Sequence, residues 1–194
     1  MKQLLFVLVA ITLFSCKEDS KVEEAVAKIP IEFKVERFDK IFYESKPEDL
    51  NKIKAQYPFF FPAGNPDSVW VNKLKNPLLK ELYKEVQIKY PTLGPIEADM
   101  EKMFAYVQYY FPKYKTPRVI TLISEVDTEA KAFYVDTLAL VSLDCYLGKD
   151  HRFYVDFPEY KKAELEENQI LPNLVSTFCY GKIAPPTDRT LLSA

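Results

Sequence analysis

The chain is poor in histidine and glycine, and each shortage excludes a class of function. His151 is the only histidine among 194 residues, whereas zinc hydrolases usually draw two or three imidazole ligands from one chain. An HExxH protease is therefore excluded within this sequence, and any Ser/His/Asp or Cys/His centre would need His151 as its base. The four glycines lie too far apart for a GxGxxG or Walker loop, which excludes the usual nucleotide-binding loops.

The chain also lacks an excess of charge of either sign. Its formal net charge is -2, and lysine and arginine are interspersed with aspartate and glutamate. Nucleic-acid binding needs a clustered basic surface, so no nucleic-acid partner is expected. The hydrophobic content of 48% is that of an ordinary globular protein. A chain of this size can bury a core without metal or disulfides, so no cofactor is expected.

The N-terminus has the pattern of an export signal. Residues 1–15 begin with a basic Lys2 and continue into an apolar run from Leu4 to Phe14. The run is about eleven residues long, too short for a helix to cross a hydrocarbon core of roughly 30 Å. We therefore expect residues 1–15 to be a cleaved signal peptide.

A lipid anchor is expected directly after this signal. Leu13-Phe14-Ser15-Cys16 resembles a bacterial lipobox, which predicts that Cys16 becomes the mature N-terminus and carries acyl chains such as palmitate. Residues 16–30 would then be a polar tether to an inner or outer membrane of the cell envelope. Lys17-Glu18-Asp19 resembles the signals that send some lipoproteins to the cell surface, and a solvated linker is the alternative.

Two cysteines remain beyond the lipid site. Cys145 and Cys179 lie among apolar neighbours, where a free thiol packs as a small hydrophobic group. An oxidising envelope would also permit them to pair. We favour two unpaired core cysteines.

Hydrophobic periodicity and helix-capping residues predict a mostly helical first half. Ile31–Arg37 alternates as a strand does, and a capping-box spacing at Ser45 starts a short helix that Pro58 ends. Further helices are expected after Asp67 or Ser68, after Asn76-Pro77, and from Gly94-Pro95 to Phe111. The first two of these could also be one kinked helix.

The second half changes in character at Pro117. Strands are predicted in Arg118–Val126 and Ala132–Tyr146, the latter broken near Asp136. Gly148-Lys149-Asp150 predicts a turn, followed by helices over Phe157–Asn168 and from Leu171. The expected fold class is α+β, with a helical N-terminal half, then a small β-sheet and further helices, in one domain over residues 31–194.

The C-terminal residues predict the start of a helix that the sequence does not complete. Pro185-Pro186-Thr187-Asp188 supplies a stop and a cap, and Leu191-Leu192 are the first apolar residues of the next helix. We therefore expect the chain to be a fragment of a longer protein.

Several residues are candidates for chemistry, each beside a structural alternative. Glu125-x-Asp127-x-Glu129 could offer oxygens to calcium but lacks the glycine of an EF-hand loop, so a charged turn is favoured. Two of Glu125, Asp136 and Asp144 could form a glycosidase pair. His151 could serve Cys145 or Ser142 as a base, although a solvated loop histidine is favoured.

Two aromatic runs have a similar ambiguity. Tyr57–Phe61 and Tyr106–Phe111 could stack on sugars or insert into a partner surface. Rings at helical spacing more often fill a core, and we expect that role for both runs.

Segments along the whole chain resemble the GldB family of gliding-motility lipoproteins, which are associated with the envelope machinery of gliding Gram-negative bacteria. These segments are Ser15-Cys16-Lys17, Val35-Glu36-Arg37-Phe38-Asp39, Lys46-Pro47-Glu48-Asp49-Leu50, Tyr109-Tyr110-Phe111-Pro112-Lys113, Tyr146-Leu147-Gly148-Lys149-Asp150-His151, Phe157-Pro158-Glu159-Tyr160 and Pro185-Pro186-Thr187-Asp188. The resemblance implies lipidation at Cys16 and a place among other gliding-motility envelope proteins. Family members continue beyond the position that matches Leu192, which agrees with a fragment.

The family is also distantly similar to zincin-like domains, in which a strand pair precedes the helix that carries HExxH. Leu171–Tyr180 would occupy that helix and contains no metal ligand, so the resemblance implies at most a degenerate, non-catalytic relative. We interpret the chain as a tethered lipoprotein with a binding or structural role and not as an enzyme. The alternative is an envelope hydrolase acting on glycan or peptide, with Glu125, Asp136, Asp144 or His151 at its site.

Overall fold

The structure is a computed structural model that describes residues 17–135, 137–180 and 182. The expected signal peptide, the lipidation site Cys16 and the helix expected after Pro185 lie outside the described residues. The chain divides into two compact units, one within Met1–Glu32 and Pro95–Thr116 and the other within Phe33–Gly94 and Pro117–Ala194. Each unit is described by itself.

Two helices lie in the described part of the first unit. The expected polar tether is helical over much of its length, because α2 spans Lys17–Val26. The longest helix is α7, which spans Gly94–Tyr110 and begins at the predicted Gly94-Pro95 step. Among the described residues, no helix combines the length and the apolar character needed to cross a membrane.

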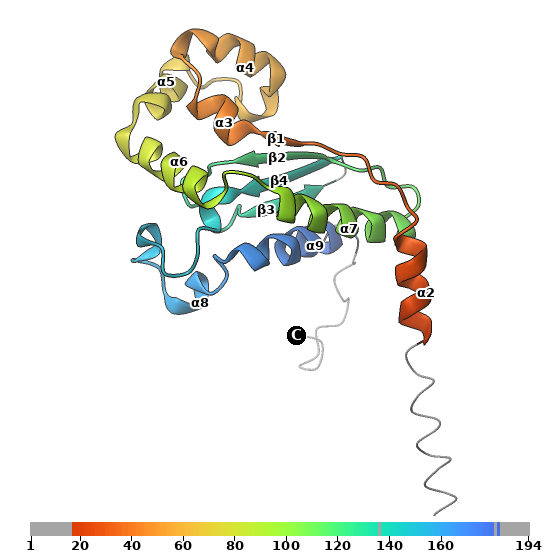
Figure 1. Cartoon of the computed structure of the whole chain (residues 1–194). Coiled ribbons are helices and arrows are strands. Elements are labelled where there is room, and N and C mark those ends of the chain that lie inside the picture. The colour runs from red at the N-terminus through yellow and green to blue at the C-terminus, as the bar shows by residue number, and fades with distance from the viewer. Residues whose placement is uncertain (1–16, 136, 181, 183–194) are drawn as a thin grey trace, which may run out of the picture. The chain divides into compact units, whose positions relative to one another are not determined.

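A four-stranded sheet forms the centre of the second unit (Figure 1). Its strands are β1 (Val35–Arg37), β2 (Arg118–Leu122), β3 (Ala132–Val135) and β4 (Leu138–Ser142), in the spatial order β1-β2-β4-β3. The first three strands in this order are parallel, with Val35 opposite Val119 and Val119 opposite Ala139, and β3 is antiparallel to β4. Residues 119–121 of β2 are all buried, as expected for a strand covered on both faces.

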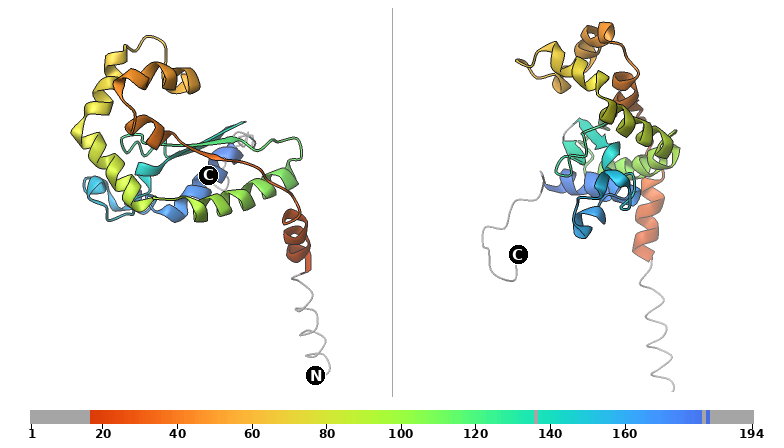
Figure 2. Two further views of the ribbon diagram at one scale, coloured as in Figure 1. Left: turned by 45° about the horizontal axis from the view of Figure 1, so that its top comes forward. Right: turned by 90° about the vertical axis from the view of Figure 1, so that its left-hand side faces the viewer.

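Helices cover the two faces of this sheet. The remaining helices of the unit are α3 (Phe38–Tyr43), α4 (Leu50–Gln56), α5 (Asp67–Lys75), α6 (Pro77–Lys89), α8 (Glu159–Lys162) and α9 (Ile170–Tyr180). On one face, Ile120 packs with a cluster of rings in which Phe38 and Tyr57 have centroids 5.0 Å apart. On the other face α9 lies along the sheet (Figure 2). The ring centroids of Phe178 in α9 and Tyr134 in β3 are 4.8 Å apart.

The predicted α+β class is confirmed, and so are most helix starts. Asn76 separates α5 from α6, so this region is two helices and not one kinked helix. Its side-chain oxygen accepts a hydrogen bond from the backbone N–H of Leu78 at 2.9 Å, which caps α6. The turn at Gly148 is also present, with the backbone N–H of His151 donating to the Gly148 carbonyl at 2.9 Å.

Three local predictions need correction. The strand predicted over Ile31–Arg37 begins only at Val35. The cap predicted at Ser45 is one residue early, because the Asp49 carboxylate accepts the backbone N–H of Lys46 at 3.1 Å. The helix predicted over Phe157–Asn168 stops after α8 at Lys162.

The physical reason for the last difference is a contact distant in sequence. The Leu165 carbonyl accepts the backbone N–H of Gly148 at 3.0 Å, and the Glu166 carboxylate accepts that of Lys149 at 3.0 Å. Both bonds hold the segment in a turn beside Gly148, and Leu165 is fully buried there. Glu166 has an extended backbone, with φ of -103° and ψ of 149°, which interrupts the predicted helix.

The two aromatic runs have different outcomes. Tyr57 and Phe61 are buried in the ring cluster, as predicted, and Phe59 lies at its exposed margin. The core role predicted for the second run is wrong in its last turn, where Tyr109, Tyr110 and Phe111 are exposed. Both thiols predicted to be unpaired are free, and Cys145 is fully buried whereas Cys179 is half-buried.

Candidate functional site

Two fully buried carboxylates lie where the parallel strands end. Asp39 comes two residues after β1, and Asp144 comes two residues after β4. Between these strands β2 ends at Leu122, and Ser124 follows it. The carboxyl edge of a parallel sheet is the usual place for a site in such folds, so these groups are the first to test for chemistry.

Asp39 is held by a complete set of donors. Arg37 donates from Nε to Oδ1 at 2.9 Å and from Nη2 to Oδ2 at 2.7 Å. Thr121 donates its hydroxyl to Oδ1 at 2.6 Å, and Gln87 donates from Nε2 to Oδ2 at 3.0 Å. The ion pair therefore joins β1, β2 and α6, and its carboxylate has no oxygen left to act on a ligand.

Asp144 is held by the backbone of one loop. Its Oδ1 accepts the N–H of Ser124 at 3.0 Å and its Oδ2 accepts that of Val126 at 2.6 Å. Within the described part of the chain no lysine, arginine or histidine pairs with it. Burial raises the pKa of Asp144 to about 6, because desolvation of the charged form outweighs these hydrogen bonds.

The loop that Asp144 holds is strained. Glu125 and Val126 have φ angles of 65° and 60°, in the left-handed region that a β-branched residue such as valine rarely adopts. Such a conformation persists only where surrounding contacts over-determine it, and the two N–H bonds to Asp144 are contacts of that kind. Asp144 therefore anchors this loop.

The acidic residues of this loop point to different partners. Glu125 pairs with Lys73, and Glu129 pairs with Lys161 at 3.1 Å. The Asp127 carboxylate accepts the backbone N–H of Glu129 at 3.0 Å. The segment is a charged turn, and within residues 17–135, 137–180 and 182 no cluster of three acids, cysteines or histidines is placed to hold a metal.

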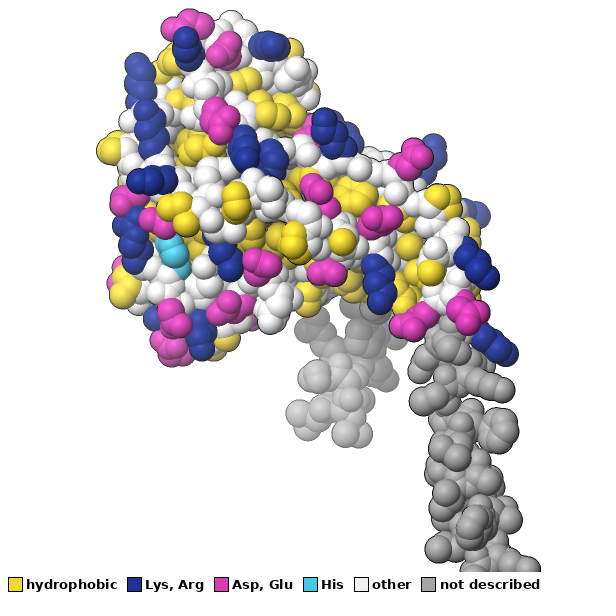
Figure 3. Space-filling model, viewed as in Figure 1, with side chains coloured by type: hydrophobic (Ala, Val, Ile, Leu, Met, Phe, Trp, Pro, Cys, Tyr) yellow, Lys and Arg dark blue, Asp and Glu magenta, His cyan; other side chains and the backbone are white. Residues whose placement is uncertain are grey.

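His151 belongs to a surface contact with α6. Its Nε2 lies 3.6 Å from a Glu85 carboxylate oxygen, and its Nδ1 accepts the backbone N–H of Phe153 at 3.4 Å. Arg152 beside it pairs with Glu81 at 2.7 Å and with Glu85 at 3.0 Å. In Figure 3 the histidine lies among acidic and basic side chains. Its imidazole contacts neither of the proposed nucleophiles.

The two proposed nucleophiles have other partners. The Cys145 thiol donates to the Asp127 carbonyl at 3.4 Å, and burial raises the pKa of this thiol far above its usual range. The Ser142 hydroxyl donates to the Ala130 carbonyl at 2.9 Å. Asp136, the remaining candidate acid, lies outside the described residues.

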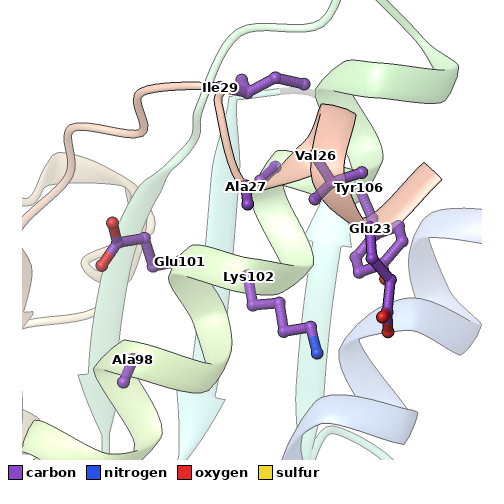
Figure 4. A pocket seen from close by; sticks show the side chains of 9 residues that line it. Glu23, Val26, Ala27, Ile29, Ala98, Glu101, Lys102 and Tyr106 are labelled. Atoms are coloured by element: carbon purple, nitrogen blue, oxygen red, sulfur yellow. The ribbon is translucent and has the colours of Figure 1, made fainter. Parts of the chain in front are cut away.

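Two hollows lie within the described residues of the first unit. One has a volume of about 360 Å³ and lies between α2 and α7, where Val26, Ala27 and Tyr106 line it (Figure 4). The other has a volume of about 450 Å³ and is lined by Glu32, Lys113 and Lys115 among others. No serine, cysteine or histidine of the described part of the chain lines either hollow.

The ion pair of Arg37 with Asp39 was missed at the sequence level. An acid directly after a predicted strand, two residues from an arginine, was an available signal for a buried pair at the strand's end. These residues belong to a segment on which the family resemblance rests, and here they have a structural role. Asp144, in contrast, was a candidate acid, and in the structure its carboxylate holds the loop that contains Ser124 and Val126.

Comparison with known proteins agrees with the sequence resemblance. A sequence model of the family described as gliding motility protein GldB matches residues 19–194. No curated protein and no solved structure matches the chain. The match extends from α2 through both units, so the chain belongs to the GldB family of gliding-motility lipoproteins.

Proposed function

We propose that this protein is a lipid-anchored component of the gliding-motility machinery that works by binding envelope partners and not by catalysis. Cys16 carries the acyl chains, and the two units form the part of the protein outside the bilayer. Family membership supports the place in the motility machinery. Two or more acyl chains make attachment stable, because each buried methylene contributes about 0.8 kcal/mol.

The observation that carries the binding role is that the candidate acid and base are engaged in structural contacts. Asp144 accepts two backbone N–H groups of a strained loop, and His151 faces Glu85 of α6. A general acid or base needs an oxygen or nitrogen directed at a substrate. These groups are directed at the protein's own backbone and side chains.

Complementation of a deletion strain tests this role. We expect His151→Ala and Glu125→Gln to restore colony spreading to the wild-type rate at wild-type protein levels. The ion pair of Glu125 with Lys73 is exposed and worth about 0–1 kcal/mol, and the hydrogen bond from the Phe153 N–H to His151 is worth about 1 kcal/mol. Lys149→Ala, a change of an exposed residue in the same turn as His151, is the matched control. Loss of spreading with normal levels of the His151 or Glu125 variant would contradict the binding role and favour an envelope hydrolase.

The anchor is tested separately by labelling cells with radioactive palmitate. We expect label in the wild-type protein and in Cys179→Ser, and none in Cys16→Ser. Cys179 is the matched control because it is half-buried and free. A Cys16→Ser protein that still incorporates palmitate would show that the lipid is attached elsewhere.

A further inference from the structure

The end of α7 and the residue that follows it present three aromatic rings to solvent. Tyr109, Tyr110 and Phe111 are 37%, 60% and 40% exposed. They pack against neighbouring rings, with centroids 5.0 Å apart for Tyr109 and Tyr110 and 5.8 Å for Phe111 and Tyr114. Lys113 and Lys115 follow, and both are exposed. We call Tyr109–Lys115 the aromatic–basic segment.

The mixture of residues in this segment fits a lipid surface better than a protein partner. The centres of protein–protein interfaces are rich in aromatic residues but depleted in lysine. The headgroup region of a bilayer accommodates tyrosine rings, and lysines near an anionic leaflet contribute about 1 kcal/mol each. The hollow beside the segment is lined by two lysines, Lys113 and Lys115, and one acid, Glu32.

The segment also lies in the unit that the lipid anchor holds. Helix α2 begins at Lys17, the residue after Cys16, and its ten residues span about 15 Å. Val26 at its other end and Tyr106 of α7 line the same hollow. Tyr110 follows Tyr106 by one helical turn, on the same side of α7. Because α2 is a short connection between Cys16 and the rest of the first unit, it keeps the aromatic–basic segment at a high effective concentration near the bilayer in which the acyl chains insert.

We propose that the aromatic–basic segment Tyr109–Lys115 is a membrane-contact surface, which seats its rings among the headgroups of the bilayer that holds Cys16 and favours anionic lipids. This inference rests on the proposed lipid anchor. It adds a second point of attachment, which fixes how the first unit lies on the membrane.

Quenching of a single tryptophan by brominated lipids tests the proposal. The acylated full chain is reconstituted into phosphatidylethanolamine–phosphatidylglycerol vesicles whose acyl chains carry bromine. Trp70, the only tryptophan in the sequence, is first changed to phenylalanine, because its indole N–H has no hydrogen-bond partner among the described residues. Tyr110→Trp then reports the segment. Tyr160→Trp is the matched control, since Tyr160 is 70% exposed in the second unit.

We expect the fluorescence of the Tyr110→Trp variant to fall about twofold in brominated vesicles and that of the Tyr160→Trp variant to stay unchanged. Adding Lys113→Glu and Lys115→Glu to the Tyr110→Trp variant should weaken its quenching, as should replacement of phosphatidylglycerol by phosphatidylcholine. Flotation of the vesicles reports the anchor independently. A Tyr110→Trp protein that floats but is not quenched would overturn the membrane-contact surface and leave the anchor standing.

Two further outcomes would also overturn the membrane-contact surface. An indole in the Tyr110→Trp variant that is shielded from acrylamide but unquenched by lipid would place a protein, either a partner or a second copy, on the segment and overturn the proposal. Protein that does not float would overturn the anchor and this inference together.

Discussion

Asp144 and Asp39 are both fully buried, but only Asp39 contacts a positively charged side chain among the described residues. Asp39 has the guanidinium of Arg37 within 2.7 Å, whereas Asp144 has backbone N–H groups and the Ser124 hydroxyl. An ion pair compensates for the loss of hydration of a carboxylate, and neutral donors do so only in part. The two residues should therefore respond differently to substitution.

Asp144 should make the stability of the protein fall as pH rises. Its pKa is about 6 in the folded chain and 3.8 is the ordinary value, so the folded state binds the proton more tightly. The stabilisation is complete below about pH 4 and is lost as pH rises through 6. The unfolding free energy of the wild type relative to Asp144→Asn should drop by on the order of 2–3 kcal/mol from pH 4 to pH 7.

Urea unfolding at several pH values measures this difference. Asp156→Asn, an exposed aspartate of a nearby turn, is the matched control. A constant gap between wild type and Asp144→Asn over this pH range would show that Asp144 does not titrate there.

Arg37, whose side chain is 16% exposed, should contribute strongly to stability through its ion pair with Asp39. Arg37→Met leaves the Asp39 carboxylate buried and unpaired, which costs about 3–5 kcal/mol. The double change Arg37→Met/Asp39→Leu also removes the buried carboxylate and should recover part of the lost unfolding free energy. Urea unfolding of the wild type and both variants checks it, and a double variant less stable than Arg37→Met would refute the ion-pair explanation.

Among the elements, α6 has an N-terminus defined by one side chain. The Asn76 amide oxygen accepts N–H groups of Leu78 and Leu79 at 2.9 and 3.4 Å. Asn76→Ala should lower the unfolding free energy by about 1 kcal/mol, whereas Asn72→Ala, an exposed change within α5, should have little effect. Thermal unfolding followed by circular dichroism compares them. Equal midpoints for both variants would show that the cap contributes nothing.

The elements also show which structure can be predicted from sequence. The start of α6 was predicted because Asn76 and Pro77 act on their own neighbours. The end of α8 at Lys162 was not predicted, because the conformation after it depends on the hydrogen bond from the Gly148 N–H to the Leu165 carbonyl, seventeen residues away. The six-residue α3 was missed because so short a helix is set by packing of Phe38 and Phe42 and not by propensity.

In the candidate site, too, the features that depend on contacts distant in sequence were not predicted. The sequence placed Asp144 inside the strand region predicted over Ala132–Tyr146, whereas β4 ends at Ser142 and the contact with Val126 that defines the role of Asp144 joins two loops. The exposed rings of Tyr109 and Tyr110 were predicted as core because helical spacing does not reveal where the covering partner ends.

At the scale of the whole molecule, the family match and the resemblance of Leu13–Cys16 to a lipobox support the account that we propose, a lipoprotein of the gliding machinery tethered through Cys16. In that account the units act where the anchor holds them. A protein freed from the membrane would keep its fold and lose its function.

Colony spreading of a deletion strain that carries Cys16→Ser tests this claim most directly, at protein levels matched by immunoblot to a strain with Cys179→Ser. The account predicts that Cys179→Ser spreads like the wild type and that Cys16→Ser does not spread. Wild-type spreading by the Cys16→Ser strain would contradict it.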